Sequence, residues 1–209
     1  MTHMGLLRLL FENPFAFVLI AIPLLYSIII HEVAHGWVAD KMGDPTARWL
    51  GRLSLNPLKH LDLMGTLMLL IFGFGWAKPV PVNFGNLRNF RKGLVFVSSA
   101  GIVANILVAF FSLFFMRLLS IKPWSIGNIA LYYIAQINIM LAAFNLIPIP
   151  PLDGSKILMG FVSRRFQYSL ARLEPYGMFI IIGLLLLRVL DPLIAFFQWL
   201  ILSAISLIL

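Results

Sequence analysis

The uncharged run Phe15–Ile30, FAFVLIAIPLLYSIII, continues directly into His31-Glu-Val-Ala-His35, and this stretch decides the fold. A helix needs about 20 apolar residues to cross a bilayer, and the run approaches that length before its first charge. A signal peptide would end at a small-residue cleavage site, but none separates this run from HEVAH. We therefore predict a retained membrane helix that carries a polar cluster at its end.

The composition of the whole chain agrees with a membrane protein. Of its 209 residues, 61% are hydrophobic and 11% are charged, whereas soluble domains have about 25% charged residues. The 16 basic and 8 acidic residues give a net charge of +8. In this apolar background, the excess predicts loops beside anionic lipid headgroups and no nucleic-acid partner. There is no cysteine, so a bound metal must use His, Asp or Glu.

The apolar runs predict an all-α polytopic membrane protein with four to six transmembrane helices. Four spans are expected, and they cover residues 14–40, 93–117, 125–149 and 174–190. The shorter run 63–76 contains three glycines, so we expect it to be re-entrant or to lie at the membrane surface. The stretch 193–209 is either a fifth span or a helix in the interface. All 209 residues are expected to form one domain, with a catalytic core at about 14–163 and C-terminal helices at 174–209.

Three basic segments set the expected orientation. Segments 41–60, 77–92 and 154–172 contain twelve of the sixteen Lys and Arg residues, so the positive-inside rule places them in the cytoplasm. The N-terminus is then outside, and the protein is a multi-pass component of the cell (inner) membrane. Segments 48–56 and 78–83 look extended, the second because of its prolines. They predict a small membrane-associated β element.

The HExxH sequence carries the strongest chemical signal. Positions i and i+4 share one face of a helix, so the imidazoles of His31 and His35 can bind one metal ion. Glu32 follows the first histidine and can act on the water that the metal activates. Charged groups within a bilayer are unfavourable and usually functional, which disfavours an incidental cluster.

A catalytic zinc site needs a third protein ligand. Counted at 1.5 Å per residue from Pro14, His31 and His35 lie near the cytoplasmic boundary. Asp153 follows the third span back to that boundary, and nearby prolines free its backbone to turn inward. Asp153 is thus the predicted third ligand, although it could instead cap a helix over 154–163. Asp62 is the reserve candidate.

These residues resemble the site-2 protease family of intramembrane zinc metalloproteases. HExxH at the end of a membrane helix is paired with a late N-x-x-P and Leu152-Asp-Gly154. Further stretches over about residues 20–190 are similar to family segments: Asn56–Asp62 with Gly65-Thr66, Gly75–Asn83, and the G-x-x-x-N motif in Ala100–Asn105. The chain looks like a minimal core without the PDZ or CBS domains of many relatives.

The resemblance implies that His31, His35 and Asp153 hold one Zn²⁺ and that Glu32 is the catalytic acid and base. It implies hydrolysis of peptide bonds in membrane-spanning substrate proteins, for regulated intramembrane proteolysis or for clearance of signal-peptide remnants. A membrane metal-ion transporter and a non-catalytic membrane scaffold are the alternatives. The natural substrate and the oligomeric state are left open.

Three other polar residues have two interpretations each. Asn105 could stabilise the oxyanion or hold the substrate backbone as a catalytic residue, or it could hydrogen-bond between packed helices. Asn145 could contact substrate, but capping of carbonyls freed near Pro148 is the preferred interpretation. His60 is expected to be a loop residue and not a ligand.

Overall fold

The first long helix begins where the sequence provides a cap. The Asn13 side chain accepts a hydrogen bond from the Ala16 amide at 3.0 Å, and Pro14 occupies the first helical position, where its missing N–H has no cost. The resulting helix, α2, runs over Pro14–Lys41. It therefore contains both the apolar run and the complete HExxH sequence.

The computed structural model describes residues 6–73 and 75–209. The other helices are α1 (Leu6–Glu12), α3 (Thr46–Trp49), α4 (Leu63–Phe72), α5 (Phe90–Leu118), α6 (Ile126–Asn145), α7 (Asp153–Phe161), α8 (Arg164–Leu173), α9 (Gly177–Leu186) and α10 (Asp191–Ser206). Single 3₁₀ turns cover Pro57–Lys59, Phe84–Asn86 and Glu174–Tyr176.

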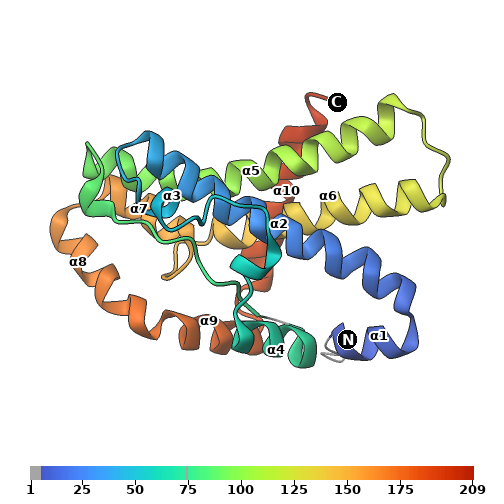
Figure 1. Cartoon of the computed structure of the whole chain (residues 1–209), viewed down its shortest axis with the longest axis horizontal. Coiled ribbons are helices and arrows are strands. Elements are labelled where there is room, and N and C mark those ends of the chain that lie inside the picture. The colour runs from blue at the N-terminus through green and yellow to red at the C-terminus, as the bar shows by residue number, and fades with distance from the viewer. Residues whose placement is uncertain (1–5, 74) are drawn as a thin grey trace.

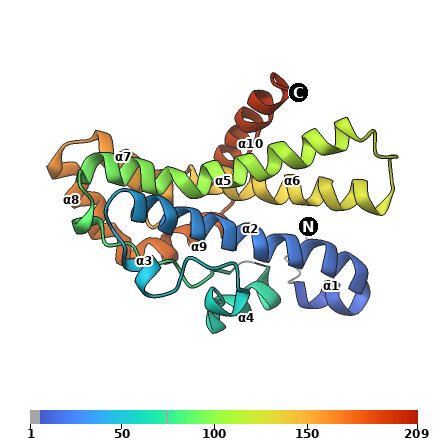
Figure 2. The ribbon, with the colours of Figure 1, turned by 45° about the horizontal axis from the view of Figure 1, so that its top comes forward.

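Helices α2, α5 and α6 run side by side and form the centre of the molecule (Figures 1 and 2). α5 and α6 are antiparallel and share a buried cluster with α10, which crosses them steeply (Figure 2). The cluster combines small and branched residues, namely Ile102, Ala109, Ile139, Ala142, Ala143, Ile201 and Ile205. Alanines at such an interface let the backbones of α5 and α6 approach each other closely, and both helices also contact α2.

Four segments are long and apolar enough to cross a membrane: Pro14–Lys41, Phe90–Leu118, Ile126–Asn145 and Arg164–Leu186. The prediction of an all-α protein with at least four such segments is confirmed. The fourth segment is composite, because α8 carries its arginines and α9 is uncharged. Helices α4 and α10 are shorter, so the re-entrant 63–76 and the placement of 193–209 stay predictions.

The predicted β element is wrong: residues 6–73 and 75–209 contain no strand. Segment 78–83 is an irregular stretch whose prolines at 79 and 81 cannot donate to a ladder. Its free amides pair elsewhere. Lys78 N donates to His60 O at 2.8 Å, and Val80 N and Asn83 N donate to the carboxylates of Glu32 and Asp44.

The end of α2, the start of α5, and helices α7 and α8 lie at one end of the molecule, and the α5–α6 loop lies at the other (Figure 1). The basic segments 77–92 and 154–172 therefore gather at the same end. Their common location is what the positive-inside interpretation requires, while the side of the membrane stays a prediction.

Candidate metal centre

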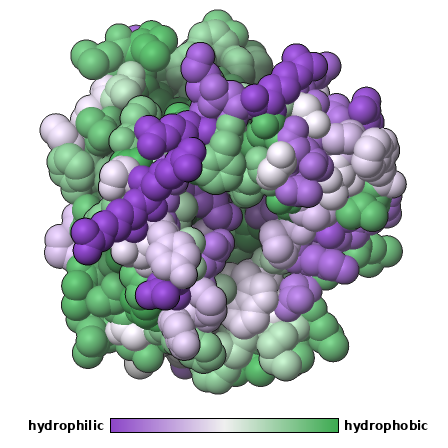
Figure 3. All heavy atoms as spheres, turned by 90° about the vertical axis from the view of Figure 1, so that its left-hand side faces the viewer, coloured by the Kyte–Doolittle hydropathy of each residue, from purple (hydrophilic) through white to green (hydrophobic). Residues whose placement is uncertain are grey.

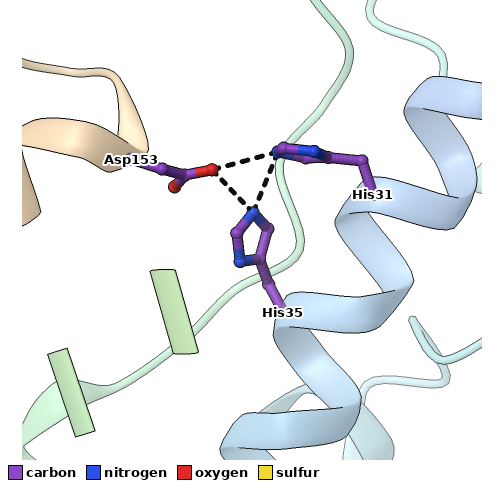
Figure 4. A group of neighbouring side chains, drawn as sticks. All are labelled: His31, His35 and Asp153. Carbon is purple, nitrogen blue, oxygen red and sulfur yellow. Dashed lines mark hydrogen bonds and ion pairs between the residues drawn. The ribbon is translucent and has the colours of Figure 1, made fainter. Parts of the chain in front are cut away.

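Two imidazoles of α2 and one carboxylate from the start of α7 point toward one another (Figure 4). His31 and His35 are one helical turn apart, and both are buried, with 7% and 8% of their surface exposed. Asp153 is equally buried at 9%. The structure thus brings together the three residues that sequence analysis predicted as ligands.

Asp153 reaches this position because the chain breaks between α6 and α7. α6 ends at Asn145 and α7 begins at Asp153, and the start of α7 packs directly on the end of α6. A Cβ added at Gly154 would lie 2.3 Å from the carbonyl oxygen of Leu146, so only glycine fits there. The Asp153 side chain does not cap α7, whose N-cap residue is Leu152 without a side-chain hydrogen bond.

The three facing atoms form a nearly equilateral triangle. His31 Nε2 and His35 Nε2 each lie 3.1 Å from Asp153 Oδ2, and they lie 3.0 Å from each other. Adjacent ligands of a tetrahedral zinc ion lie about 3.3–3.5 Å apart, given bond lengths of about 2.0–2.2 Å. The triangle is only slightly tighter than this, and two imidazole nitrogens with one carboxylate oxygen are a donor set that zinc accepts.

Hydrogen bonds on the far side of each ring present the Nε2 lone pairs to this triangle. His31 Nδ1 lies 2.6 Å from Asn105 Oδ1, and His35 Nδ1 lies 2.7 Å from the carbonyl oxygen of Val97. Both partners are acceptors, so each neutral ring carries its proton on Nδ1. Asp153 Oδ2 then faces two lone pairs, and no described residue gives it a hydrogen bond. Three buried acceptors in contact favour a cation among them.

The orientation of Asn105 is itself determined by a buried polar chain. Its Nδ2 donates to Asn138 Oδ1 at 2.7 Å and to Ser27 O at 3.2 Å. Asn138 Nδ2 in turn donates to Ser27 Oγ at 2.7 Å and to Ile134 O at 2.8 Å. Both protons of each amide are used, so each Oδ1 must accept. Asn105 therefore has no free donor for an oxyanion, and its contacts favour positioning of His31.

Gly101 explains the spacing of the G-x-x-x-N motif. A Cβ at this position would lie 2.5 Å from His31 Cε1 and 2.5 Å from His35 Nε2. Glycine therefore lets α5 pack directly against both rings, and Asn105 lies one turn further along the same helix face. The interhelical alternative considered for this motif describes the observed contacts.

Glu32 holds the extended segment beside the metal centre. Its Oε2 accepts a hydrogen bond from the Val80 amide at 2.8 Å, and Val80 itself is buried. Segment 78–83 is further held by Arg52 Nη2, which donates to the carbonyl oxygens of Lys78 and Pro79 at 2.8 and 3.1 Å. The sequence did not predict this Glu32–Val80 contact, since the two residues are distant in the chain.

Asp44 is a second buried carboxylate, and sequence analysis assigned it no function. It is fully buried and accepts hydrogen bonds from Thr46, Asn83 N at 2.7 Å and Asn86 Nδ2 at 2.8 Å. Burial raises the pKa of Asp44, but the hydrogen bonds from Thr46, Asn86 and Asn83 outweigh that effect, so its pKa lies below the ordinary value. Asp44 thereby joins the loop after α2 to the loop before α5.

The remaining candidates have local structural contacts. Asp62 caps α4 by accepting from the Gly65 amide at 2.8 Å, and it does not belong to the metal-ligating group. His60 is a fully buried loop residue whose Nε2 contacts Ser54 O at 2.7 Å. Asn145 donates to Leu141 O of its own helix at 2.9 Å, so the capping of carbonyls freed near Pro148 stays a prediction.

Comparison of the sequence with known proteins places this chain in a family. Residues 124–188 match Peptidase family M50. The chain is 38% identical to the Bacillus subtilis protein YwhC over 88% of this chain and 86% of that relative. It is 29% identical to Rip2 of Mycolicibacterium smegmatis over 81% and 67%, and 33% identical to MJ0611 of Methanocaldococcus jannaschii over 63% and 64%. Each relative is named "Putative zinc metalloprotease". No solved structure matches the chain significantly.

The similarity to YwhC extends over most of both chains, so the chain belongs to peptidase family M50, the site-2 protease family. It is a multi-pass membrane metalloprotease, and its metal is zinc. This membership decides in favour of the enzyme over the transporter and scaffold alternatives.

Proposed function

We propose that the protein hydrolyses peptide bonds within or beside the membrane-spanning segments of other proteins, with His31, His35 and Asp153 as the zinc ligands. The observation that carries this proposal is the convergence of the three ligand atoms within 3.1 Å of one another. Two of them come from a helix long and apolar enough to cross a membrane. A substrate that reaches them must therefore enter from the lipid or from its interface.

Bound zinc lowers the pKa of water and polarises a carbonyl group. Glu32 is the proposed acid and base: it accepts the proton of the attacking water and then donates it to the leaving amine. Its Oε2 is held by the Val80 amide, which leaves Oε1 for proton transfer. Asn105 and Val97 O keep both imidazoles in the tautomer that binds metal. We assign Asn105 as a positioning residue.

The basic segments at the metal-centre end of the molecule support a cytoplasmic location for the site, in the cell (inner) membrane. A helical substrate must unwind before its peptide bonds are accessible. Release of a membrane-tethered regulator and clearance of signal-peptide remnants both fit this chemistry. Product masses separate the two, since a regulator is cut once and a remnant leaves only short peptides.

The test is cleavage of single-span proteins in liposomes by wild type and by Glu32→Gln, with product mass analysis and zinc determination. We expect Glu32→Gln to retain zinc and to lose activity by about 10²–10⁴-fold, the usual contribution of general acid–base catalysis. Cleavage at the wild-type rate by Glu32→Gln would falsify the assignment. Cleavage only of soluble peptides would contradict a membrane-spanning substrate.

A further inference from the structure

A groove of about 680 Å³ lies between the start of α5 and helices α7 and α8, and none of its lining residues belongs to the metal centre. The groove combines an apolar floor with a cationic rim. Its lining comprises Asn89, Phe90, Arg91 and Leu94 of the α5 start, Met159 of α7, and Arg164, Gln167, Tyr168 and Ala171 of α8.

The floor is part of the protein core. Leu94 and Met159 are 5% and 8% exposed and pack in one cluster with Leu170. Gln167 joins α8 to α7 through a hydrogen bond from its Nε2 to Met159 O at 2.6 Å. Phe90 stays half exposed at 49%, which leaves an apolar surface open beside the floor.

The rim has positive charge without a matching carboxylate. Arg91 and Arg164 line the groove, and neither forms an ion pair among the described residues. No acidic residue is part of the lining. A guanidinium group binds phosphate through paired hydrogen bonds, so two arginines at one rim favour an anionic phosphate group between them.

The groove also lies where a membrane surface is expected. Phe90 is the first residue of α5, a helix long enough to span. α8 carries Arg164, Arg165 and Arg172 together with apolar residues at 166, 170 and 173, a pattern typical of a helix in the lipid interface. Hydrophilic side chains gather around a hollow on this end of the molecule (Figure 3). Basic pockets between membrane helices bind anionic lipid headgroups.

We propose that this groove binds one anionic phospholipid, with its phosphate between Arg91 and Arg164 and an acyl chain against Leu94 and Met159. The apolar floor is the reason for choosing a lipid over free phosphate. α7 carries Asp153 at its first residue and Met159 in the groove. If Asp153 is a zinc ligand, as proposed above, the lipid also stabilises the position of the third ligand relative to α5.

The test measures lipid binding by native mass spectrometry and thermal unfolding, in neutral detergent, without reference to activity. Wild-type protein is expected to retain one phosphatidylglycerol and to unfold at a higher temperature with it, but not with phosphatidylcholine. Arg91→Gln/Arg164→Gln should bind phosphatidylglycerol at least about tenfold more weakly. The matched control Lys122→Gln/Arg188→Gln removes the same charge from other loops and should bind like wild type.

Three results would overturn the proposal. Equal losses in the groove variant and the control would show attraction by net charge alone. If phosphatidylcholine bound as tightly as phosphatidylglycerol, the arginines would not select an anionic lipid. If inorganic phosphate alone raised the unfolding temperature as much as phosphatidylglycerol, the groove would be a phosphate site without a lipid chain. Glu32→Gln protein should bind phosphatidylglycerol normally, so failure of the proteolytic proposal leaves this result intact. Unfolding of the lipid-free variants checks that both are folded.

Discussion

Asp44 and Asp153 are both buried carboxylates, but their surroundings differ. Asp44 accepts hydrogen bonds from Thr46, Asn83 and Asn86, all of which are donors supplied by the protein. Asp153 Oδ2 faces two imidazole nitrogens at 3.1 Å and receives no hydrogen bond from the described residues. A buried charge needs either donors or a cation. The first carboxylate is therefore expected to stabilise the fold, and the second to bind the metal.

The largest expected effect is the loss of zinc affinity on substitution of Asp153, whose Oδ2 receives no hydrogen bond from the described residues. Asp153→Asn should weaken zinc binding by more than about 100-fold, because even the loss of a group that only supports a ligand costs about 10–100-fold. Zinc affinity is measured by competition with a chelator, alongside thermal unfolding of the zinc-free protein. Asp62→Asn is the matched control, since Asp62 caps α4, and it should keep wild-type affinity. The reverse result would make Asp62 the third ligand.

Substitution of Asp44, the carboxylate that accepts hydrogen bonds from the protein, should instead lower the free energy of unfolding. Asp44→Asn brings an NH₂ group against donors from Thr46, Asn83 or Asn86. We expect destabilisation by about 2 kcal/mol, the usual range for a buried polar group left without its partner. Reversible unfolding in mixed micelles measures this destabilisation. The zinc affinity of the folded fraction should stay within about twofold of wild type, a much smaller change than the loss of a zinc ligand would cause. A large loss of zinc affinity without destabilisation would contradict the comparison.

Substitutions in the hydrogen-bonded chain from His31 through Asn105 to Asn138 should weaken zinc binding by an intermediate amount. Asn105→Leu is expected to weaken zinc binding by about 10–100-fold, as for other groups that orient a ligand. Asn138→Leu acts one hydrogen bond further away, so its effect should be about tenfold or less. The absorption spectrum of the Co²⁺-loaded variants reports altered ligand orientation directly.

Ser112→Ala provides the matched control for these variants. Ser112 is also buried on α5, but it donates only to Val108 O within its own helix. Its zinc affinity and Co²⁺ spectrum should equal those of wild type. If Ser112→Ala changed them as much as Asn105→Leu, the effect would come from helix packing and not from ring orientation.

The smallest effect is expected from pH. Hydrogen bonds lower the pKa of folded Asp44, so its contribution to stability is present above the unfolded pKa of about 3.9. It is lost as the pH falls through the lower pKa of the folded state. The difference in unfolding free energy between wild type and Asp44→Asn should therefore stay constant between about pH 5 and about pH 7, and it should shrink below about pH 4. A difference that grows on acidification would mean that the folded pKa is raised.

Local patterns predicted much of this molecule. The uncharged runs predicted α2, α5 and α6 within a few residues, because helices of this length depend on hydrophobic content along the chain. The i, i+4 spacing of His31 and His35 predicted one shared helix face. The extended appearance of 78–83 was a weaker signal. It describes the backbone, but a strand needs a partner, and here the amides pair with Glu32, Asp44 and His60 O.

Other features depended on segments that are distant in the chain. The sequence alone indicated a helix with two imidazoles, and it offered Asp153, with Asp62 in reserve, as the third metal ligand. Only tertiary packing decided the rest. The start of α7 packs on the end of α6 and places Asp153 beside the rings. Ser27 and Asn138 turn Asn105 toward His31, and the loops after α2 and before α5 supply the donors to Asp44. The physical reason is that helix formation is satisfied within a segment, whereas a buried polar atom must find its partner in three dimensions.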